Sequence, residues 1–321
     1  MLAPCVQAEV LRLGVWHEAL SRDGPGLLLR DLQKGVPELV AMADLVRIAA
    51  PDILVLTKMD FDASGLAARA FADTISPDAY PFLMSLRSNE GVPTGVDLDG
   101  DRRGHEPEDA QGYGWFPGQG ALAVLSRVPI RQGAAVSYND ILWKELPGTH
   151  MDPSDPGYDV QRLSSGGHWS VPLDLGFAEE GQSATLWVLV GHSGPPVFDG
   201  PEDRNGRRNL DELQLWSQIL DGRHGPAPGA HMVFMANTNL DPNAGEGYRD
   251  AMLDFLDSGR FQDPFPDLPT AYWETLEPMR VSYLLPSTTL ELLDVKRWPR
   301  GEGMTHHLLT IDIAVPAPVK P

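Results

Sequence analysis

Short apolar runs that stop at polar or turn residues are the main pattern along this chain. The clearest lies at residues 232–235, Met-Val-Phe-Met, which leads into Ala-Asn-Thr-Asn and the turn Asp241-Pro242. A run of this length between turn residues predicts a buried β-strand, and in an α/β protein the carboxyl end of such a strand carries the chemistry. The same argument predicts strands at residues 10–16, 53–56, 120–130, 163–172, 184–190, 280–287 and 308–315.

Helical spacing of apolar residues separates several of these runs. Residues 36–50 predict a helix that ends before Pro51, because proline disfavours the α conformation in the residue that precedes it. Residues 250–256 predict a short helix. A longer helix is predicted after Asn209, with an apolar face made of Leu210, Leu213, Trp216, Ile219 and Leu220.

The domain prediction follows from length and composition. No Ser/Gly-rich linker divides the 321 residues, so we expect one large α/β domain over residues 1–321, with its core at about residues 11–313. An apolar content of 42% is that of a globular core. No run approaches the roughly 18 apolar residues of a membrane span, which predicts a soluble protein without one.

Charge bears on the class of partner. The chain has 25 Lys and Arg residues against 45 Asp and Glu residues, a net charge of −20. A field of this sign repels polyanions, which makes nucleic acid an unlikely partner unless a local basic patch overrides it. A small anionic or phosphorylated ligand, or a protein, is the expected partner.

The N-terminal residues bear on location. They show no basic region followed by an apolar segment, so a secretory signal is not predicted and a cytoplasmic location is expected. The lone Cys5 has no partner for an internal disulfide, which is compatible with a reducing compartment.

Several of these strand ends resemble motifs of the endonuclease/exonuclease/phosphatase superfamily, which has the deoxyribonuclease I fold. Residues 236–239 resemble its Gly-Asp-x-Asn strand end, and residues 120–130 its Gly-x-Ala-x-Leu-Ser-Arg-x-Pro-Ile strand. Residues 192–196 resemble its His-x-x-Pro-Pro-like turn, residues 280–287 its Arg-x-Asp-Tyr-x-x-x-Ser strand, and residues 304–306 its terminal Ser-Asp-His. The resemblance implies a four-layer α/β sandwich, with two mixed sheets packed face to face and helices outside.

The resemblance also implies a site, in which a metal polarises a phosphoryl oxygen, an Asp activates water and a His stabilises developing charge. His192, His306 and Asn239 match this pattern. Four carboxylates do not, because their positions hold Lys58 for the metal-binding Glu, Asn237 for the water-activating Asp, and Ser282 and Thr305 for two further Asp residues. An ammonium does not ligate Mg²⁺ and an amide is no general base, so Mg²⁺ is not expected at this site.

Two other segments are candidates for binding. Arg204, Arg207 and Arg208 precede the predicted helix after Asn209 and could form a phosphate cradle with Lys58, unless nearby carboxylates neutralise them. Asp97, Asp99, Asp101 and Glu108 have the oxygen-ligand spacing of a Ca²⁺ loop. Arg102 replaces the glycine of that loop, and a solvated acidic loop is the alternative.

Two hypotheses of function follow. The first is a pseudoenzyme that retains the fold and an anion-binding or phosphate-binding cleft. The second is an active phosphoesterase with a rebuilt site, in which His17, His192 and His306, with His307 as a further candidate, hold Zn²⁺, for which imidazole is a good ligand. Residues that could replace a lost carboxylate are Glu18, Asp60, Asp62 and Asp241.

Overall fold

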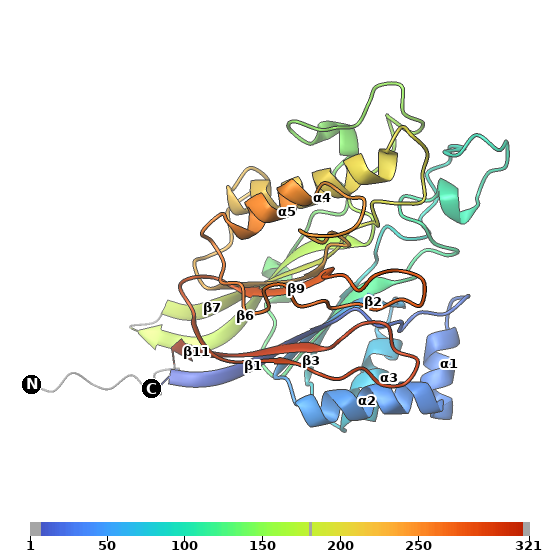
Figure 1. Ribbon diagram of the computed structural model, residues 1–321. Helices are drawn as coiled ribbons and strands as arrows, with labels where there is room; N and C mark the ends of the chain where they lie inside the picture. The colour runs from blue at the N-terminus through green and yellow to red at the C-terminus, as the bar shows by residue number, and fades with distance from the viewer. Residues whose placement is uncertain (1–7, 180–181, 317–321) are drawn as a thin grey trace, which may run out of the picture.

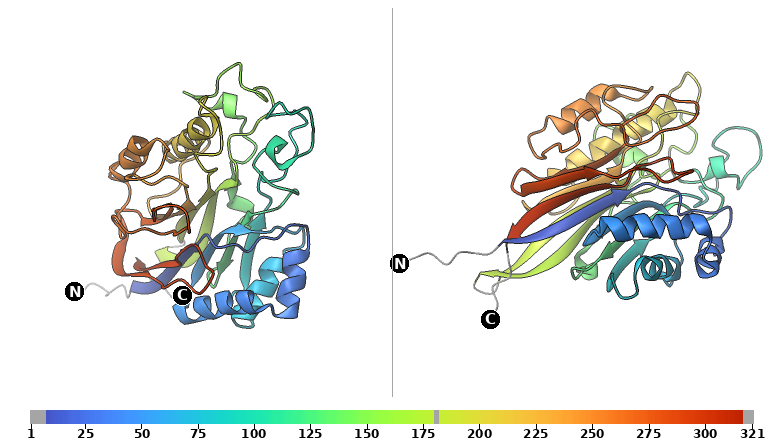
Figure 2. Two further views of the ribbon diagram at one scale, coloured as in Figure 1. Left: turned by 45° about the vertical axis from the view of Figure 1, so that its right-hand side comes forward. Right: turned by 60° about the horizontal axis from the view of Figure 1, so that its bottom comes forward.

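Two β-sheets packed face to face form the centre of the computed structural model, which describes residues 8–179 and 182–316 (Figure 1). Cys5 and the rest of residues 1–7 lie outside the described residues. Each sheet combines parallel and antiparallel pairs, and helices lie on both outer faces (Figure 2). The predicted four-layer α/β sandwich with two mixed sheets is therefore confirmed.

The six-stranded sheet has the order β10-β11-β1-β2-β4-β3. Its parallel pair is β1 with β2, which brings the carboxyl ends of these two strands to the same edge. Helices α1 (Leu27–Lys34), α2 (Pro37–Ala49) and α3 (Leu66–Ile75) cover its outer face. The strands are β1 (Ala8–Trp16), β2 (Ile53–Met59), β3 (Phe82–Leu86), β4 (Ala121–Ser126), β10 (Glu291–Arg297) and β11 (Leu309–Pro316).

The five-stranded sheet has the order β5-β6-β7-β8-β9. Its parallel pair is β7 with β8, whose register places His192 opposite Asn237. Helices α4 (Arg204–Leu220) and α5 (Arg249–Leu256) cover its outer face. The strands are β5 (Val136–Ser137), β6 (Gly167–Glu179), β7 (Gln182–His192), β8 (Met232–Asn237) and β9 (Ser282–Pro286), and the short 3₁₀ helices are Pro107–Asp109, Gln132–Ala134 and Trp143–Glu145.

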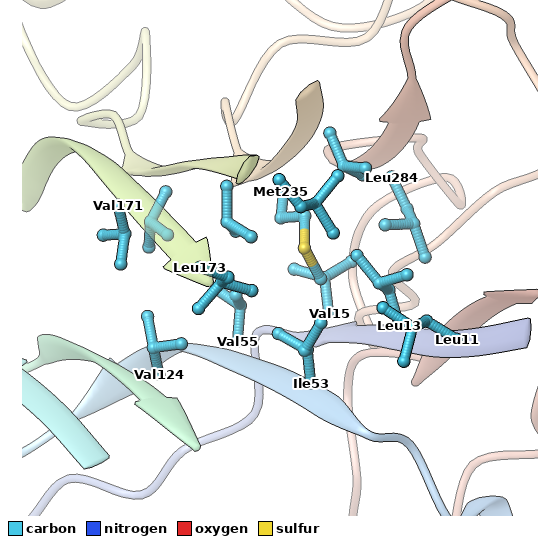
Figure 3. Packing of buried hydrophobic residues seen from close by; sticks show 14 of the residues in the cluster. Leu11, Leu13, Val15, Ile53, Val55, Val124, Val171, Leu173, Met235 and Leu284 are labelled. Carbon is cyan, nitrogen blue, oxygen red and sulfur yellow. The ribbon is translucent and has the colours of Figure 1, made fainter. Parts of the chain in front are cut away.

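The space between the sheets is filled by branched and aliphatic side chains. Val15, Val55 and Val124 from one sheet face Leu173 and Met235 from the other, and all of them are fully buried (Figure 3). Because side chains alternate along a strand, the remaining positions pack under the helices. This core fixes the two parallel strand pairs against each other, and with them the residues at their carboxyl ends.

Two boundaries differ from the sequence prediction in ways that affect the site. Strand β2 continues through Met59, so Lys58 lies within the strand and not on a solvated loop. An irregularity in the pairing between Leu56 and Met59 accompanies this extension. Helix α4 begins at Arg204, so the three arginines lie in its first turns and not before it.

Candidate functional site

Three histidines from distant parts of the chain meet at the strand ends. His17 follows β1, His192 ends β7, and His306 lies just before β11. The ring centroid of His17 lies 4.6 Å from that of His192 and 4.6 Å from that of His306. All three residues are buried, with at most 9% of their surface exposed. We refer to them as the histidine cluster.

Local contacts hold each ring in place. Nδ1 of His17 lies 2.9 Å from the hydroxyl of Thr57, the residue before Lys58 on β2. The backbone N–H of His306 donates to Oε2 of Glu18 at 2.9 Å, and its carbonyl accepts the indole N–H of Trp16 at 3.1 Å. These contacts join the end of β1 to the segment before β11.

A glycine makes room for His192. A Cβ atom on Gly166 would lie 2.4 Å from Nδ1 of this ring, which is closer than non-bonded atoms approach. His192 therefore needs glycine at this position.

Lys58 and a carboxylate that the motifs did not indicate complete the site. The ammonium of Lys58 donates to both oxygens of Glu90, at 3.1 and 3.3 Å. Glu90 follows β3 and is only 5% exposed. Its Oε1 lies 3.1 Å from Nδ1 of His192, but this contact is outside hydrogen-bond geometry and leaves that nitrogen without a partner. Residues 88–90 carry no motif, so sequence reasoning had no signal for Glu90.

Burial sets the protonation of the cluster. Loss of solvation lowers the pKa of all three histidines, and neighbouring imidazole rings or the Lys58 ammonium lower it further. For His306 the pKa falls to about 3. Burial alone would raise the pKa of Glu90, but Lys58 and His192 more than offset this and its pKa is lowered. At neutral pH the site thus holds neutral imidazoles around one ion pair.

Asn237 on β8 and Ser282 on β9, where the resemblance implies Asp residues, bond to each other. The Asn237 amide is fully buried and donates to Oγ of Ser282 at 3.3 Å. Its oxygen accepts the backbone N–H of Asn239 at 3.1 Å. Asn239 has a left-handed backbone, with φ of 51°, and its side-chain amide donates to the carbonyl of Ser193 at 2.7 Å. Amides and a hydroxyl here supply hydrogen bonds but no strong base.

The four carboxylates named as replacements accept hydrogen bonds from the main chain. Glu18 accepts the N–H groups of Thr305 and His306, and Asp60 accepts those of Arg22 and Gly120. Asp62 accepts backbone N–H groups at the start of α3, and Asp241 accepts those of the turn after β8 and of Arg280. Each of these four carboxylates therefore stabilises backbone near the site, whereas the carboxylate of Glu90 lies against an imidazole ring of the histidine cluster.

The three arginines bind protein groups. Arg207 forms a two-bond pair with Asp155, at 2.8 and 2.9 Å. Arg208 is 8% exposed and donates to the carbonyls of Gln111, Arg162 and Leu163. Arg204 donates to the carbonyl of Pro156 and to the side chain of Gln161. These contacts hold α4 to the loops beside it, and none of them involves the histidine cluster.

The acidic loop groups a different set of oxygens from the predicted one. Ligand atoms of Asp97, Asp99 and Asp109 lie within 4.8 Å of one another, and Asp101 and Glu108 are not in this set. Asp97 already accepts the N–H groups of Gly100 and Arg102. In residues 8–179 and 182–316 this is the one such set of three, so the imidazole nitrogens of the histidine cluster do not form another.

Comparisons with known proteins agree with the fold. The family model described as "Endonuclease/Exonuclease/phosphatase family" matches residues 21–311, and the chain belongs to this family. A search of curated proteins found no match. No helix in the described part of the chain is both long and apolar enough to cross a membrane.

Solved structures show the same fold at low sequence identity. An endonuclease/exonuclease/phosphatase from Beutenbergia cavernae DSM 12333 is 16% identical, with a TM-score of 0.60 over 95% of this chain and 72% of that one. Sphingomyelinase C from Streptomyces griseocarneus is 14% identical, with a TM-score of 0.51 over 95% and 99%. A 3′ phosphatase from Neisseria, bound to a product DNA hairpin, is 14% identical, with a TM-score of 0.50 over 94% and 98%.

The residues at the centre do not fit the Mg²⁺ ion that the family resemblance implies. Mg²⁺ is held by hard oxygen ligands, usually carboxylates. Lys58 carries an ammonium where the resemblance implies the metal-binding Glu, and the nearby carboxylate of Glu90 is already paired with it. The remaining side chains in contact are imidazoles and amides, and therefore no chemical step is assigned to a metal.

Proposed function

We propose that the protein is a pseudoenzyme: a member of the endonuclease/exonuclease/phosphatase family that does not hydrolyse phosphoesters and binds an anionic ligand or a protein partner. The observation that carries this proposal is the pair Asn237 and Ser282. They face each other in register, Asn237 where the resemblance implies the water-activating Asp and Ser282 where it implies another Asp, and an amide bonded to a hydroxyl does not take a proton from water at neutral pH. Losing members of a catalytic unit costs several orders of magnitude in rate.

Two features support binding of an anion at the same centre. Nδ1 of His192 and Nδ1 of His306 are buried and have no hydrogen-bond partner, which is costly unless another group supplies one. The Lys58 side chain is 32% exposed, and an ammonium has three N–H groups to donate. An anionic oxygen beside Nδ1 of His306 and the Lys58 ammonium would satisfy these groups, whereas Nδ1 of His192 already faces Oε1 of Glu90 at 3.1 Å. The net charge of −20 favours a small phosphorylated ligand over duplex nucleic acid.

The competing function is an active phosphoesterase with Zn²⁺ on the histidine cluster. The 4.6 Å ring separations favour it. Against it, Nδ1 of His17 already contacts Thr57, and the three rings offer no set of nitrogens within 4.8 Å of one another. Zn–N bonds are about 2.1 Å long, so the rings would have to move before they shared one ion.

A hydrolysis assay separates the two functions. We expect no turnover of bis-p-nitrophenyl phosphate or p-nitrophenyl phosphate, in metal-free protein or with Mg²⁺, Mn²⁺, Ca²⁺ or Zn²⁺ added. The control is His192→Ala, which removes the ring at the end of β7. Metal-dependent turnover in the native protein that this variant loses would overturn the proposal and establish a rebuilt site.

Phosphate affinity tests the binding half of the proposal. Isothermal titration with inorganic phosphate should show saturable binding that weakens at least about tenfold in Lys58→Glu, because the substitution reverses the charge that faces the anion. Lys34→Glu, at the exposed end of α1, makes the same charge change elsewhere and should bind phosphate like the native protein. Equal affinities in the two variants would place the anion away from Lys58.

A further inference from the structure

The ion pair between Lys58 and Glu90 is held in place by the surrounding fold. Lys58 comes from β2 and Glu90 from the segment after β3, so two separate parts of the chain are needed to form it. Both carboxylate oxygens accept from the ammonium, and the carboxylate side chain is 6% exposed. A carboxylate this buried needs a counter-charge, and Lys58 is the cation that provides it.

Gly120 leaves the space that the pair fills. Its φ of +54° is a conformation that residues with a Cβ rarely adopt. A Cβ built on it would lie 2.2 Å from Oε2 of Glu90 and 3.1 Å from Cε of Lys58. The backbone at the start of β4 is thus shaped around both side chains, which a chance surface ion pair would not require.

The pair also determines which cations the centre accepts. The histidine cluster is neutral at pH 7, so the charges of Lys58 and Glu90 sum to zero within it. A divalent ion that approached Glu90 would meet the Lys58 ammonium at the same oxygens, and two cations that share one carboxylate repel each other strongly in a buried site.

We propose that Lys58 is the resident cation of this centre, held by Glu90, and that the pair excludes divalent metal ions from the position where the family binds one. Glu90 is thereby assigned a role as the positioning residue for Lys58. This inference deepens the proposed function, on which it rests for the absence of metal chemistry. It also makes a separate claim, that the native protein does not bind divalent metal ions, which can be tested without measuring hydrolysis.

Metal titrations of the native protein and two variants test it. The melting temperature of the native protein should not change with Mn²⁺ or with a chelator. Lys58→Glu places a second carboxylate beside Glu90, so it should melt lower without metal. It should also gain saturable Mn²⁺ binding, with a rise of roughly 5 °C at a metal concentration about 100-fold above its Kd. Lys34→Glu, matched in charge, should gain neither.

The charge-swapped double variant Lys58→Glu with Glu90→Lys provides a second test if the single variant does not fold. It keeps one ion pair, so it should recover stability relative to Lys58→Glu and remain indifferent to Mn²⁺. Saturable Mn²⁺ binding by the native protein, or a Lys58→Glu variant that binds no more Mn²⁺ than Lys34→Glu, would overturn the inference.

The two proposals fail in different ways. Metal-independent hydrolysis by the native protein would overturn the proposed function and leave the ion pair intact. Mn²⁺ binding by the native protein without turnover would overturn the inference about the pair alone.

Discussion

Two buried groups of histidine and charged residues lie near the carboxyl end of β7, and they differ in how fully their polar atoms are bonded. In the first, Nδ1 of His168 lies 2.7 Å from the hydroxyl of Ser164, and Nε2 lies 3.2 Å from the carbonyl of Glu212. The Glu212 carboxylate accepts two backbone N–H groups, and Arg208 donates to several carbonyls. In the histidine cluster, two ring nitrogens have no partner.

This difference in hydrogen bonding shows which observation distinguishes a binding site from a structural group. Burial lowers the pKa of both His168 and His306 to about 3, so a shifted pKa does not distinguish the two groups. The hydrogen bonds do distinguish the two groups. A group whose polar atoms are all bonded stabilises the fold, whereas a buried polar atom without a partner either binds a ligand or lowers stability. We therefore treat the His168 group as structural and the histidine cluster as the centre of the site.

Removing the charge of Arg208 should have the largest effect. Arg208→Met leaves several buried carbonyls unpaired and removes a positive charge that stabilises ionised Glu212, so we expect a loss of about 3–5 kcal/mol in the free energy of unfolding. Urea unfolding measures it. Arg223→Met, at an exposed position after α4, is the matched control and should cost less than about 0.5 kcal/mol. A loss below 1 kcal/mol in Arg208→Met would contradict the structural assignment.

Replacing each histidine by leucine compares the two groups directly. His168→Leu leaves the hydroxyl of Ser164 and the carbonyl of Glu212 without their partner and should cost about 1–3 kcal/mol. His306→Leu removes a nitrogen that has no partner and should cost less than about 1 kcal/mol. Equal losses in urea unfolding would remove the distinction between the groups.

The pH dependence of stability tests the lowered pKa values of His168 and His306. An unfolded histidine takes up a proton below about pH 6.5, whereas folded His168 and His306 do so only near pH 3. The unfolded state then binds more protons, so stability falls as the pH falls through this window, by up to about 1.4 kcal/mol per pH unit for each histidine. The slope should be flatter in either leucine variant. Comparing each variant with the native protein cancels the opposite slope of Glu212, whose pKa burial raises to about 7.

The fold could be predicted from the sequence because strand ends are local. Residues 232–235 and 53–56 carry their apolar run and their terminating residues within a few positions, and the family that such motifs resemble is the one whose model matches residues 21–311. Strands β3 and β10 were not predicted from the sequence. The apolar run of β3 is short, Phe82-Leu83-Met84, and β10 is mostly exposed and has charged residues among its apolar ones.

The site could be predicted only in part, because its contacts join distant segments. His17, His192 and His306 were candidates from their places at strand ends, and the structure brings them together. Glu90 was not a candidate, because its distance from Lys58 depends on the paths of β2, β3 and the loop that ends at Gly120. The arginines were candidates because they lie at the start of a predicted helix, and their carbonyl partners lie in loops that no motif places.

A crystal structure of the protein with both Mn²⁺ and phosphate would test most directly whether the Lys58 ammonium takes the place of a metal ion at this centre. We expect Lys58 to remain within hydrogen-bond distance of Glu90, phosphate oxygens to lie beside Nδ1 of His192 or His306, and no anomalous manganese signal at the centre. A manganese ion bound by Glu90 and the histidine cluster, with Lys58 displaced, would contradict the account.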